Sequence, residues 1–491
     1  MWLFRPSSHD AHFASAVSPM LASRFRPLPL LATLLLVSAG WLTALNSAQA
    51  QGFSVYEQGT CTMAQAGAAV AQPCDDGSAI LFNPAGLLRT DDVTLSAGAT
   101  MIAAQGSFAS DYTGTETDLQ NDPILVPHLY GAWRVSPDVA VGLGTYVPYG
   151  LETQWPTNWD GAFEGYDNAL QSIYIQPTIA YQITDRIRIG GGPILGISSV
   201  TLNQRLDVSS QAVPSEDVPD GTTFGNLGIP FHTAFADAKL DAGGAIGFGG
   251  HIGLQVEATE RIDFGARFLS PVKFDYEGDA TFEQVSTGLQ LPSNNPITGQ
   301  PTALDLVLEP SFVEGPLVAQ TIETELTMPA QVVAGVSVQA TNRLQLQADY
   351  QWTGWSSFDT IPLDFEREAL DQTRREGYEN TNAVRLGGSF EATEALTLRA
   401  GYLFNQAAAP DRTVTPLLPE ADRNHVTAGL SWDATDTITL NAAYQYLGQN
   451  DRRGRVRGAR PGEENPSAET LNSGLYSFSA HLIGTTVTIH L

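Results

Sequence analysis

Residues 344–353 read LQLQADYQWT, a stretch in which apolar and polar side chains alternate. Leucine, alanine and aromatic side chains share one face, while glutamine, aspartate and threonine share the other. Successive side chains of a β-strand point to opposite faces, so a period of two over about ten residues indicates a strand with one apolar and one polar face. Residues 396–405 (LTLRAGYLFN) and 437–446 (TITLNAAYQY) repeat the pattern. The repetition predicts an all-β chain.

The spacing of turns sets the topology. Short polar turns lie near residues 136–138, 184–186, 259–261, 341–343, 393–395 and 435–437. Long polar segments lie near 103–124, 150–169, 203–241, 277–320, 357–381, 406–423 and 448–474. Six short turns and seven long loops join fourteen strands, and sorting of connections by length is typical of outer-membrane barrels. A soluble sandwich would carry more Lys and Glu on its polar face, and its loops would not sort by length.

Residues 93–491 are therefore predicted to form a 14-stranded antiparallel transmembrane β-barrel in the Gram-negative outer membrane. The barrel must close, because an open edge in hydrocarbon leaves backbone N–H and C=O groups unpaired. Aromatic side chains gather near both strand ends, as two membrane interfaces select. Those at the long-loop ends are Tyr350, Trp352, Trp355, Tyr402, Phe404, Tyr444 and Tyr446, and those near the short turns are Trp133 and Trp432.

Composition agrees with a membrane barrel. Only 16% of the 491 residues are charged, whereas soluble proteins carry about 25%. After residue 50, no stretch approaches the ~20 apolar residues that a spanning helix needs. The net charge of −28 excludes nucleic acid as a partner, since phosphate binding requires a basic surface.

The first fifty residues are predicted to be a signal peptide. Residues 28–45 are mostly apolar, follow Arg24 and Arg26, and lead to Ala48-Gln49-Ala50, which is an A-x-A cleavage site. An N-terminal anchor helix is the alternative. Residues 51–92 do not alternate, and their small, mildly apolar side chains favour a plug (hatch) in the barrel lumen over a segment hanging in the periplasm.

Cys61 and Cys74 are the only cysteines, and both lie in the exported part. An oxidising compartment favours a disulfide between them. A metal site or a reactive thiol is the alternative, but two thiols alone make a poor zinc site. We predict no metal and no cofactor.

Residues 75–87 read DDGSAILFNPAGL. Together with Met328-Pro329, the block Arg399–Tyr402 and the strand end Asp349–Trp352, they resemble the long-chain fatty acid transporters of Gram-negative outer membranes (the FadL/TodX type, OMPP1). The resemblance implies passive uptake of hydrophobic compounds, foremost long-chain fatty acids, with lateral release near the third strand. It also implies that Asn83, Pro84 and Ala85 form the plug's turn and that Phe53 touches the ligand. The cysteine pair departs from the family.

Two loops carry apolar side chains that could collect such a ligand. The residues are Phe224, Leu227, Ile229, Phe231 and Phe235 in one loop, and Leu289, Leu291, Ile297, Leu304, Leu306, Val307 and Leu308 in the other. They predict either an open groove or small loop cores. Pro148 in the third strand cannot donate a ladder hydrogen bond. It therefore marks either a wall opening or a harmless strand end.

Arginines complete the candidate site residues. Arg385 and Arg399 project into the lumen and could bind a ligand carboxylate, or could pair internally with Asp349 or Glu391. Five more arginines crowd the last long loop and could bridge lipopolysaccharide phosphates, or could simply be solvated. These are Arg452, Arg453, Arg455, Arg457 and Arg460.

No catalytic motif stands out, so we predict no catalytic residues and no enzyme. The predicted partners are hydrophobic small molecules, such as fatty acids or hydrocarbons, and outer-membrane lipid, and the chain is expected to be a monomer. A general porin and a structural or adhesive barrel are the alternatives.

Overall fold

The computed structural model describes residues 54–215, 217–415, 417–454 and 473–491. The predicted signal peptide, Phe53 and the three arginines Arg455, Arg457 and Arg460 lie outside the described residues. Within those ranges, no helix is long and apolar enough to cross a membrane.

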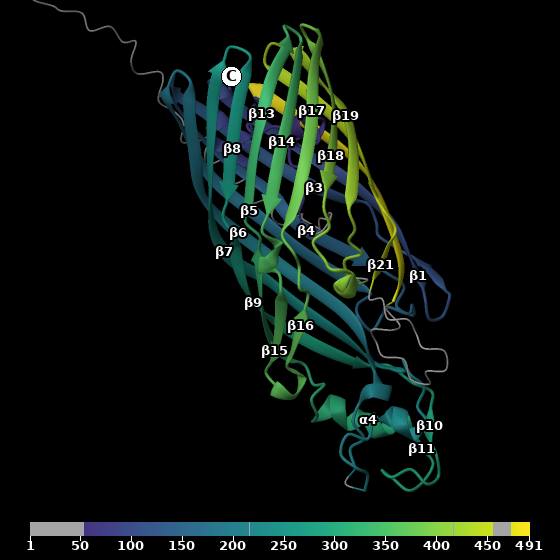
Figure 1. Ribbon diagram of the computed structural model, residues 1–491. Helices are drawn as coiled ribbons and strands as arrows, with labels where there is room; N and C mark the ends of the chain where they lie inside the picture. Colours follow the sequence, from purple (N-terminus) through teal and green to yellow (C-terminus); the bar gives the residue numbers. More distant parts are fainter. Residues whose placement is uncertain (1–53, 216, 416, 455–472) are drawn as a thin grey trace, which may run out of the picture. The chain divides into compact units, whose positions relative to one another are not determined.

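Fourteen antiparallel strands form a closed barrel, which confirms the predicted fold class (Figure 1). Each strand pairs with the next along the chain, and β22 closes the barrel on β1 from Thr94↔His490 to Ser110↔Gly474. Two of the fourteen are interrupted, so that β8 continues as β9 and β12 continues as β13. The barrel strands are β1 (Val93–Ser110), β3 (Ile124–Ser136), β4 (Val139–Gln154), β5 (Asp167–Thr184), β6 (Ile187–Asp207), β7 (Ala234–Thr259), β8 (Ile262–Leu269) with β9 (Val272–Gln284), β12 (Gln320–Met328) with β13 (Gln331–Thr341), β14 (Leu344–Thr353), β17 (Thr381–Thr393), β18 (Leu396–Asn405), β19 (Arg423–Thr435), β20 (Ile438–Gln449) and β22 (Gly474–His490).

All six predicted short turns join adjacent strands through two residues, for example Pro137-Asp138 between β3 and β4. The long connections all lie at the other end of the barrel, and several strands run further into them than the sequence predicted. β6 ends at Asp207, β7 begins at Ala234 and β9 ends at Gln284. Smaller elements fill the loops: β2 (Glu116–Asp118), η3 (Val208–Ser210), η4 (Phe224–Leu227), β10 (Gln290–Leu291), β11 (Thr302–Ala303), α4 (Leu304–Val313), η5 (Trp355–Ser357), β15 (Thr360–Phe365), η6 (Glu368–Leu370), β16 (Gln372–Arg375), η7 (Asp411–Thr413) and β21 (Arg452–Gly454).

The apolar strand faces point outward, as predicted. On β14, Leu346 and Tyr350 are 49% and 50% exposed, while Gln347 and Asp349 are buried in the interior. Trp133 and Trp432 are likewise exposed near the short turns. Trp355 is an exception to the predicted aromatic belt. It is buried against Tyr149, because the chain turns inward at η5 once β14 has ended.

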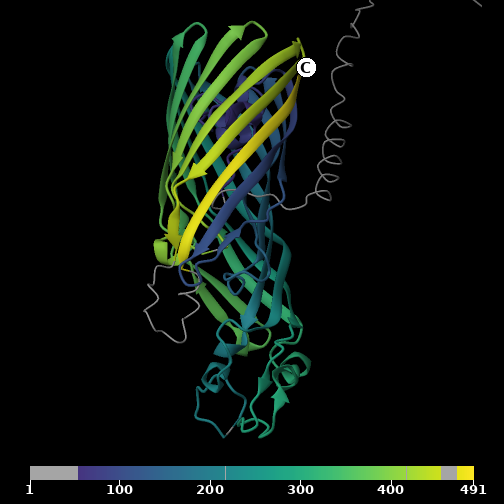
Figure 2. The same cartoon turned by 90° about the vertical axis from the view of Figure 1, so that its right-hand side faces the viewer.

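Residues 54–92 lie inside the barrel, where Figure 2 shows them in purple behind the strands of the wall. They include α2 (Thr60–Met63), α3 (Ala79–Phe82) and η2 (Pro84–Arg89). Wall glycines let this N-terminal segment approach the strands. A Cβ on Gly265 would lie 2.0 Å from the carbonyl oxygen of Val70, and one on Gly401 would lie 2.4 Å from the carbonyl carbon of Gln65. A larger residue at either position would displace the segment.

Candidate apolar ligand site

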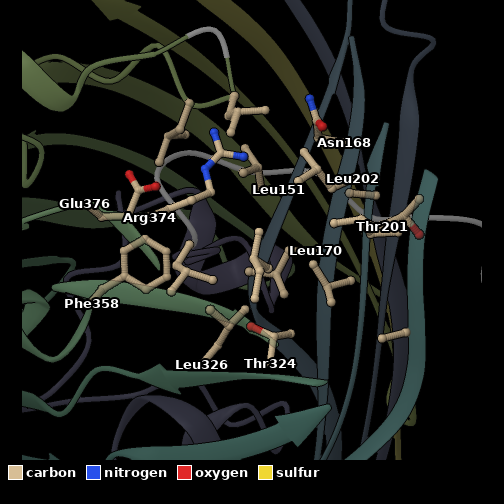
Figure 3. Close-up of a pocket in the computed structure, with 18 of the residues that line it drawn as sticks. Leu151, Asn168, Leu170, Thr201, Leu202, Thr324, Leu326, Phe358, Arg374 and Glu376 are labelled. Carbon is tan, nitrogen blue, oxygen red and sulfur yellow. The ribbon is translucent and has the colours of Figure 1, made fainter. Parts of the chain in front are cut away.

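An apolar pocket lies at the long-loop end of the barrel (Figure 3). The space within it is about 900 Å³ when the part that is open to solvent is included. Its apolar lining comes from β4, β5, β6, β7, β12 and the loops around 358–378 and 415–418. The apolar lining residues are Leu151, Ala169, Leu170, Val200, Leu202, Leu240, Ala242, Ile322, Leu326, Phe358, Ile361, Leu363, Leu417 and Leu418.

The strands build this pocket by reversing their pattern above the membrane. On β7, Leu240 and Ala242 are buried, while Lys239 and Asp241 are exposed on the outside and form an ion pair. Nearer the short turns, the same strand exposes Ile252 and buries His251. An outer surface that faces water instead of lipid needs charged side chains, so the apolar face turns inward.

Many of these pocket residues were not predicted, because the sequence pattern placed residues 150–169, 203–241, 357–381 and 406–423 in long loops. The signal was nevertheless present. Residues 239–242 (KLDA) and 321–326 (TIETEL) alternate, but their apolar members face the interior. On β12, Ile322 and Leu326 are buried and Glu323 is exposed.

Arg374 of β16 is the one cationic residue among the described residues that line the pocket. Figure 3 shows its guanidinium on the same side as Glu376, facing the leucine-rich wall. The guanidinium lies 3.0 Å from a carboxylate oxygen of Glu164, and both side chains are largely buried. A single arginine at the edge of an aliphatic pocket can bind one carboxylate by charge-assisted hydrogen bonds.

The two apolar loops pack against each other as a compact core, which is the alternative to an open groove. Phe224 is 1% exposed within this core, together with Phe235 and Leu304. Phe231 is half-buried and stacks on the ring of His232, with 4.4 Å between ring centroids. Neither Phe224 nor Phe231 lines the apolar pocket.

Pro148 lies inside β4, not at its end. The ladder between β3 and β4 stops at Leu129↔Thr145, and the register against β5 shifts between Tyr146 and Tyr149. The described part of the N-terminal segment takes the place of β3 here. The N–H of Val55 donates to the carbonyl of Pro148 at 2.8 Å, and the N–H of Val147 donates to the Gln58 side chain at 3.1 Å. The wall therefore has a gap at β4 that residues 54–58 cover.

Asn83, Pro84 and Ala85 hold the N-terminal segment in place. The Asn83 side chain donates to the carbonyls of Val70 at 2.6 Å and Leu254 at 3.0 Å, and it accepts from the N–H of Ala85 at 3.2 Å. Pro84 begins η2, which packs on β5, β6 and β7. None of the three lines the apolar pocket.

The lumen arginines also lie away from the apolar pocket. Arg385 is 2% exposed, and its guanidinium lies 4.5 Å from the centroid of the Tyr56 ring. Arg399 donates to Ser431 and lines a polar cavity of about 1000 Å³ near the short turns, together with Asp75 and Glu391. The structure thus brings Arg385 to the N-terminal segment and Arg399 to the periplasmic end.

Cys61 and Cys74 form a disulfide, with their Cα atoms 6.4 Å apart. The ring they close contains Ala69 and Val70, whose N–H groups donate to one carboxylate oxygen of Asp349 at 2.8 and 2.9 Å. The disulfide therefore braces the part of the segment that is bound to β14.

Two of the five loop arginines are described, and both pair within the protein. Arg452 contacts Asp411 at 2.8 Å and donates to the carbonyl of Ala409 at 2.7 Å. Arg453 pairs with Asp111. Both carboxylates lie in other loops, Asp411 in η7 and Asp111 just after β1, so these two arginines bind neighbouring loops.

A family model described as "Outer membrane protein transport protein (OMPP1/FadL/TodX)" matches residues 42–490. The chain is 24% identical over 444 residues to outer membrane protein P1 of Haemophilus influenzae, covering 85% of this chain and 89% of that protein. It is 22% identical over 406 residues to a long-chain fatty acid transport protein of Escherichia coli, covering 79% and 84%.

Solved structures share the fold. A FadL homologue from Pseudomonas aeruginosa superimposes with a TM-score of 0.74 at 19% identity, covering 89% of this chain and 99% of that one. The toluene transporter TodX of Pseudomonas putida superimposes with a TM-score of 0.62 at 20% identity, covering 90% and 99%. The chain therefore belongs to the OMPP1/FadL/TodX family, whose members are outer-membrane channels for hydrophobic compounds and not enzymes.

Proposed function

We propose that this chain takes up long-chain fatty acids, with residues 51–92 acting as a plug and release occurring sideways through the gap at β4. The observation that carries the proposal is the aliphatic pocket with Arg374 as its one cation among the described lining residues. An alkyl chain suits the leucines, and a carboxylate suits the guanidinium. A monoaromatic hydrocarbon, such as the toluene that TodX transports, carries no charged group that could pair with the arginine.

Burial of the alkyl chain supplies the driving force. At ~0.8 kcal/mol per CH₂, a ~16-carbon chain gains roughly 12 kcal/mol before the entropic costs of binding are subtracted. The carboxylate would compete with Glu164 for Arg374, because a carboxylate oxygen of Glu164 lies 3.0 Å from the Arg374 guanidinium. A bound fatty acid would thus replace one ion pair with another and bury its tail in the same step.

The interior favours sideways release. The cavity near the short turns is lined almost entirely by polar groups, including Gln72, Asp75 and Arg89. An apolar chain gains nothing there and would desolvate those groups. Two hydrogen bonds cover the gap at β4, in which the N–H of Val55 donates to Pro148 and the Gln58 side chain accepts from the N–H of Val147; both can break when the N-terminal segment shifts.

Binding measurements on two variants test the substrate class. Arg374→Gln should weaken binding of palmitate about tenfold, because a charge-assisted hydrogen bond contributes roughly 1.5–3 kcal/mol, and should leave hexadecanol binding unchanged. Arg375→Gln is the matched control, since Arg375 neighbours it on β16 but is exposed. Equal palmitate affinity in both variants, or tighter binding of toluene than of palmitate by the unaltered protein, would exclude the fatty acid proposal.

We also expect a monomer that contacts lipopolysaccharide through its outer rim. A closed barrel offers no free strand edge for a second copy. Native mass spectrometry of the purified protein checks both expectations, since it reports the subunit count and any retained lipid; a dimer would contradict the first.

A further inference from the structure

The barrel wall has a second interruption, between β7 and the strand formed by β8 and β9. The β7–β9 ladder ends at Asp241↔Asp279, and the β7–β8 ladder begins only at His251↔Leu269. Residues 242–250 and 270–278 face each other without ladder pairs, and all of them are among the described residues. On their other sides both strands remain paired, as at Ile197↔Ile246 and Phe274↔Leu326. We call this stretch the β7–β9 seam.

The sequence explains why these strands do not pair. Gly243 and Gly244 form a bulge in β7, where the register against β6 shifts and Gly244 has a φ of 76°. Ser270 and Pro271 interrupt the facing strand, and proline has no N–H to donate. Each irregularity shifts the alternation of inward-facing and outward-facing side chains along its strand. In the stretch between the two irregularities, the strands are therefore out of register and form no ladder pairs.

One backbone hydrogen bond crosses the seam at its inner end, from the N–H of Ser270 to the carbonyl of Gly250 at 2.9 Å, and apolar side chains fill the rest. Val272 and Phe274 are fully buried and lie against glycines of β7. A Cβ on Gly247 would lie 2.6 Å from a Val272 methyl and 2.9 Å from the Phe274 ring. The same ring reaches Gly196 on β6, where a Cβ would lie 2.6 Å away. The carbonyl oxygen of Lys273 also lies 2.6 Å from the position of a Cβ on Gly247.

The seam joins the apolar pocket to the outer surface. Ala242, the first β7 residue beyond the ladder, lines the pocket, and so does Leu326, which pairs with Phe274. On the outside, Ile246 is 59% exposed and Phe248 is 75% exposed, in the row of β7 residues that faces lipid. Apolar groups therefore line the route on both sides of the wall.

We infer that the β7–β9 seam is a second lateral opening, through which apolar molecules pass between the pocket and the outer leaflet when Val272 and Phe274 rotate away. The inference rests on the proposed function. It differs from the β4 gap in what closes it, because residues 54–58 cover the gap at β4, whereas groups of the barrel wall itself close the seam. Passage here needs no movement of the N-terminal segment.

A reversible crosslink tests the opening. The pair Gly247→Cys/Val272→Cys spans the seam, and Val256→Cys/Phe264→Cys spans a regular ladder of the same strands. Palmitate uptake is measured in Gram-negative cells lacking their own fatty acid transporter, before and after reduction. The control pair accounts for reduction of the Cys61–Cys74 bridge.

Oxidation of the seam pair should lower uptake at least threefold relative to the reduced form, while the control pair should change little. Equal uptake by the oxidised and reduced seam pair would overturn the second opening alone. Absence of uptake by the reduced proteins would overturn the proposed function as well.

A substitution gives an independent readout if the crosslink forms incompletely. Phe274→Ala should raise palmitate uptake about two- to fivefold, because it removes the ring that covers Gly247 and Gly196. Phe264→Ala is the control, since Phe264 is exposed on the paired part of β8. The same uptake in both variants would contradict the inference.

Discussion

Asp349 shows how a single side chain ties the barrel wall to its contents. The alternation in residues 344–353 placed it correctly on the inward face, and pairing with Arg385 or Arg399 was one of the alternatives for it. In the structure it accepts hydrogen bonds from the backbone N–H groups of Ala69 and Val70. Those residues are about 280 positions away in the chain, so no local pattern could have predicted the contact.

Asp349→Ala should loosen the N-terminal segment, because it leaves two buried N–H groups unpaired at a cost of about 1–3 kcal/mol each. We expect cells expressing the variant to become more sensitive to large polar antibiotics, which enter through an unblocked barrel. Glu323→Ala is the control, since Glu323 is an exposed carboxylate on β12. Equal sensitivity of the two strains would show that Asp349 does not hold the segment.

At the scale of elements, strands and short turns were predictable because their signals are local. Period-two alternation and the two-residue polar turns each depend on neighbours in sequence. The extent of β6, β7 and β9 was not predicted, because the same alternation serves a strand in lipid and a strand in water. Only the surrounding medium decides which face turns inward, and that reversal creates the pocket around Leu240 and Leu326.

The N-terminal segment divides into two parts with different roles. The ring closed by Cys61 and Cys74 is bound to β14 through Asp349, whereas residues 54–58 lie outside the ring and cover the gap at β4. The bridge therefore does not itself restrain the covering residues. The disulfide and the residues that cover the gap lie in separate stretches of the same segment.

Replacement of both cysteines by serine should separate stability from transport. Cys61→Ser/Cys74→Ser should lower the thermal unfolding temperature, since closing a loop of this size contributes about 3 kcal/mol. Palmitate uptake should stay within twofold of the unaltered protein. A several-fold change in uptake with an unchanged unfolding temperature would mean that the bridge governs transport.

For the whole molecule, the order of the pocket, the N-terminal segment and the polar cavity along the barrel determines which route an apolar molecule can take. An apolar pocket lies at the long-loop end, residues 54–92 occupy the interior, and a polar cavity lies near the short turns. A path straight through would take an alkyl chain from leucines into charged groups, and for this reason we propose that it leaves through the wall instead. The sequence predicted the barrel, but not which compartment was apolar.

Uptake of two kinds of solute by one strain tests most directly whether the barrel is a closed route for apolar molecules. Gram-negative cells lacking their own long-chain fatty acid transporter would express the chain, and uptake of labelled palmitate and of a small sugar would be measured together. We predict saturable palmitate uptake well above that of the empty strain, with sugar permeability unchanged. Sugar uptake at porin-like rates without faster palmitate uptake would contradict this prediction.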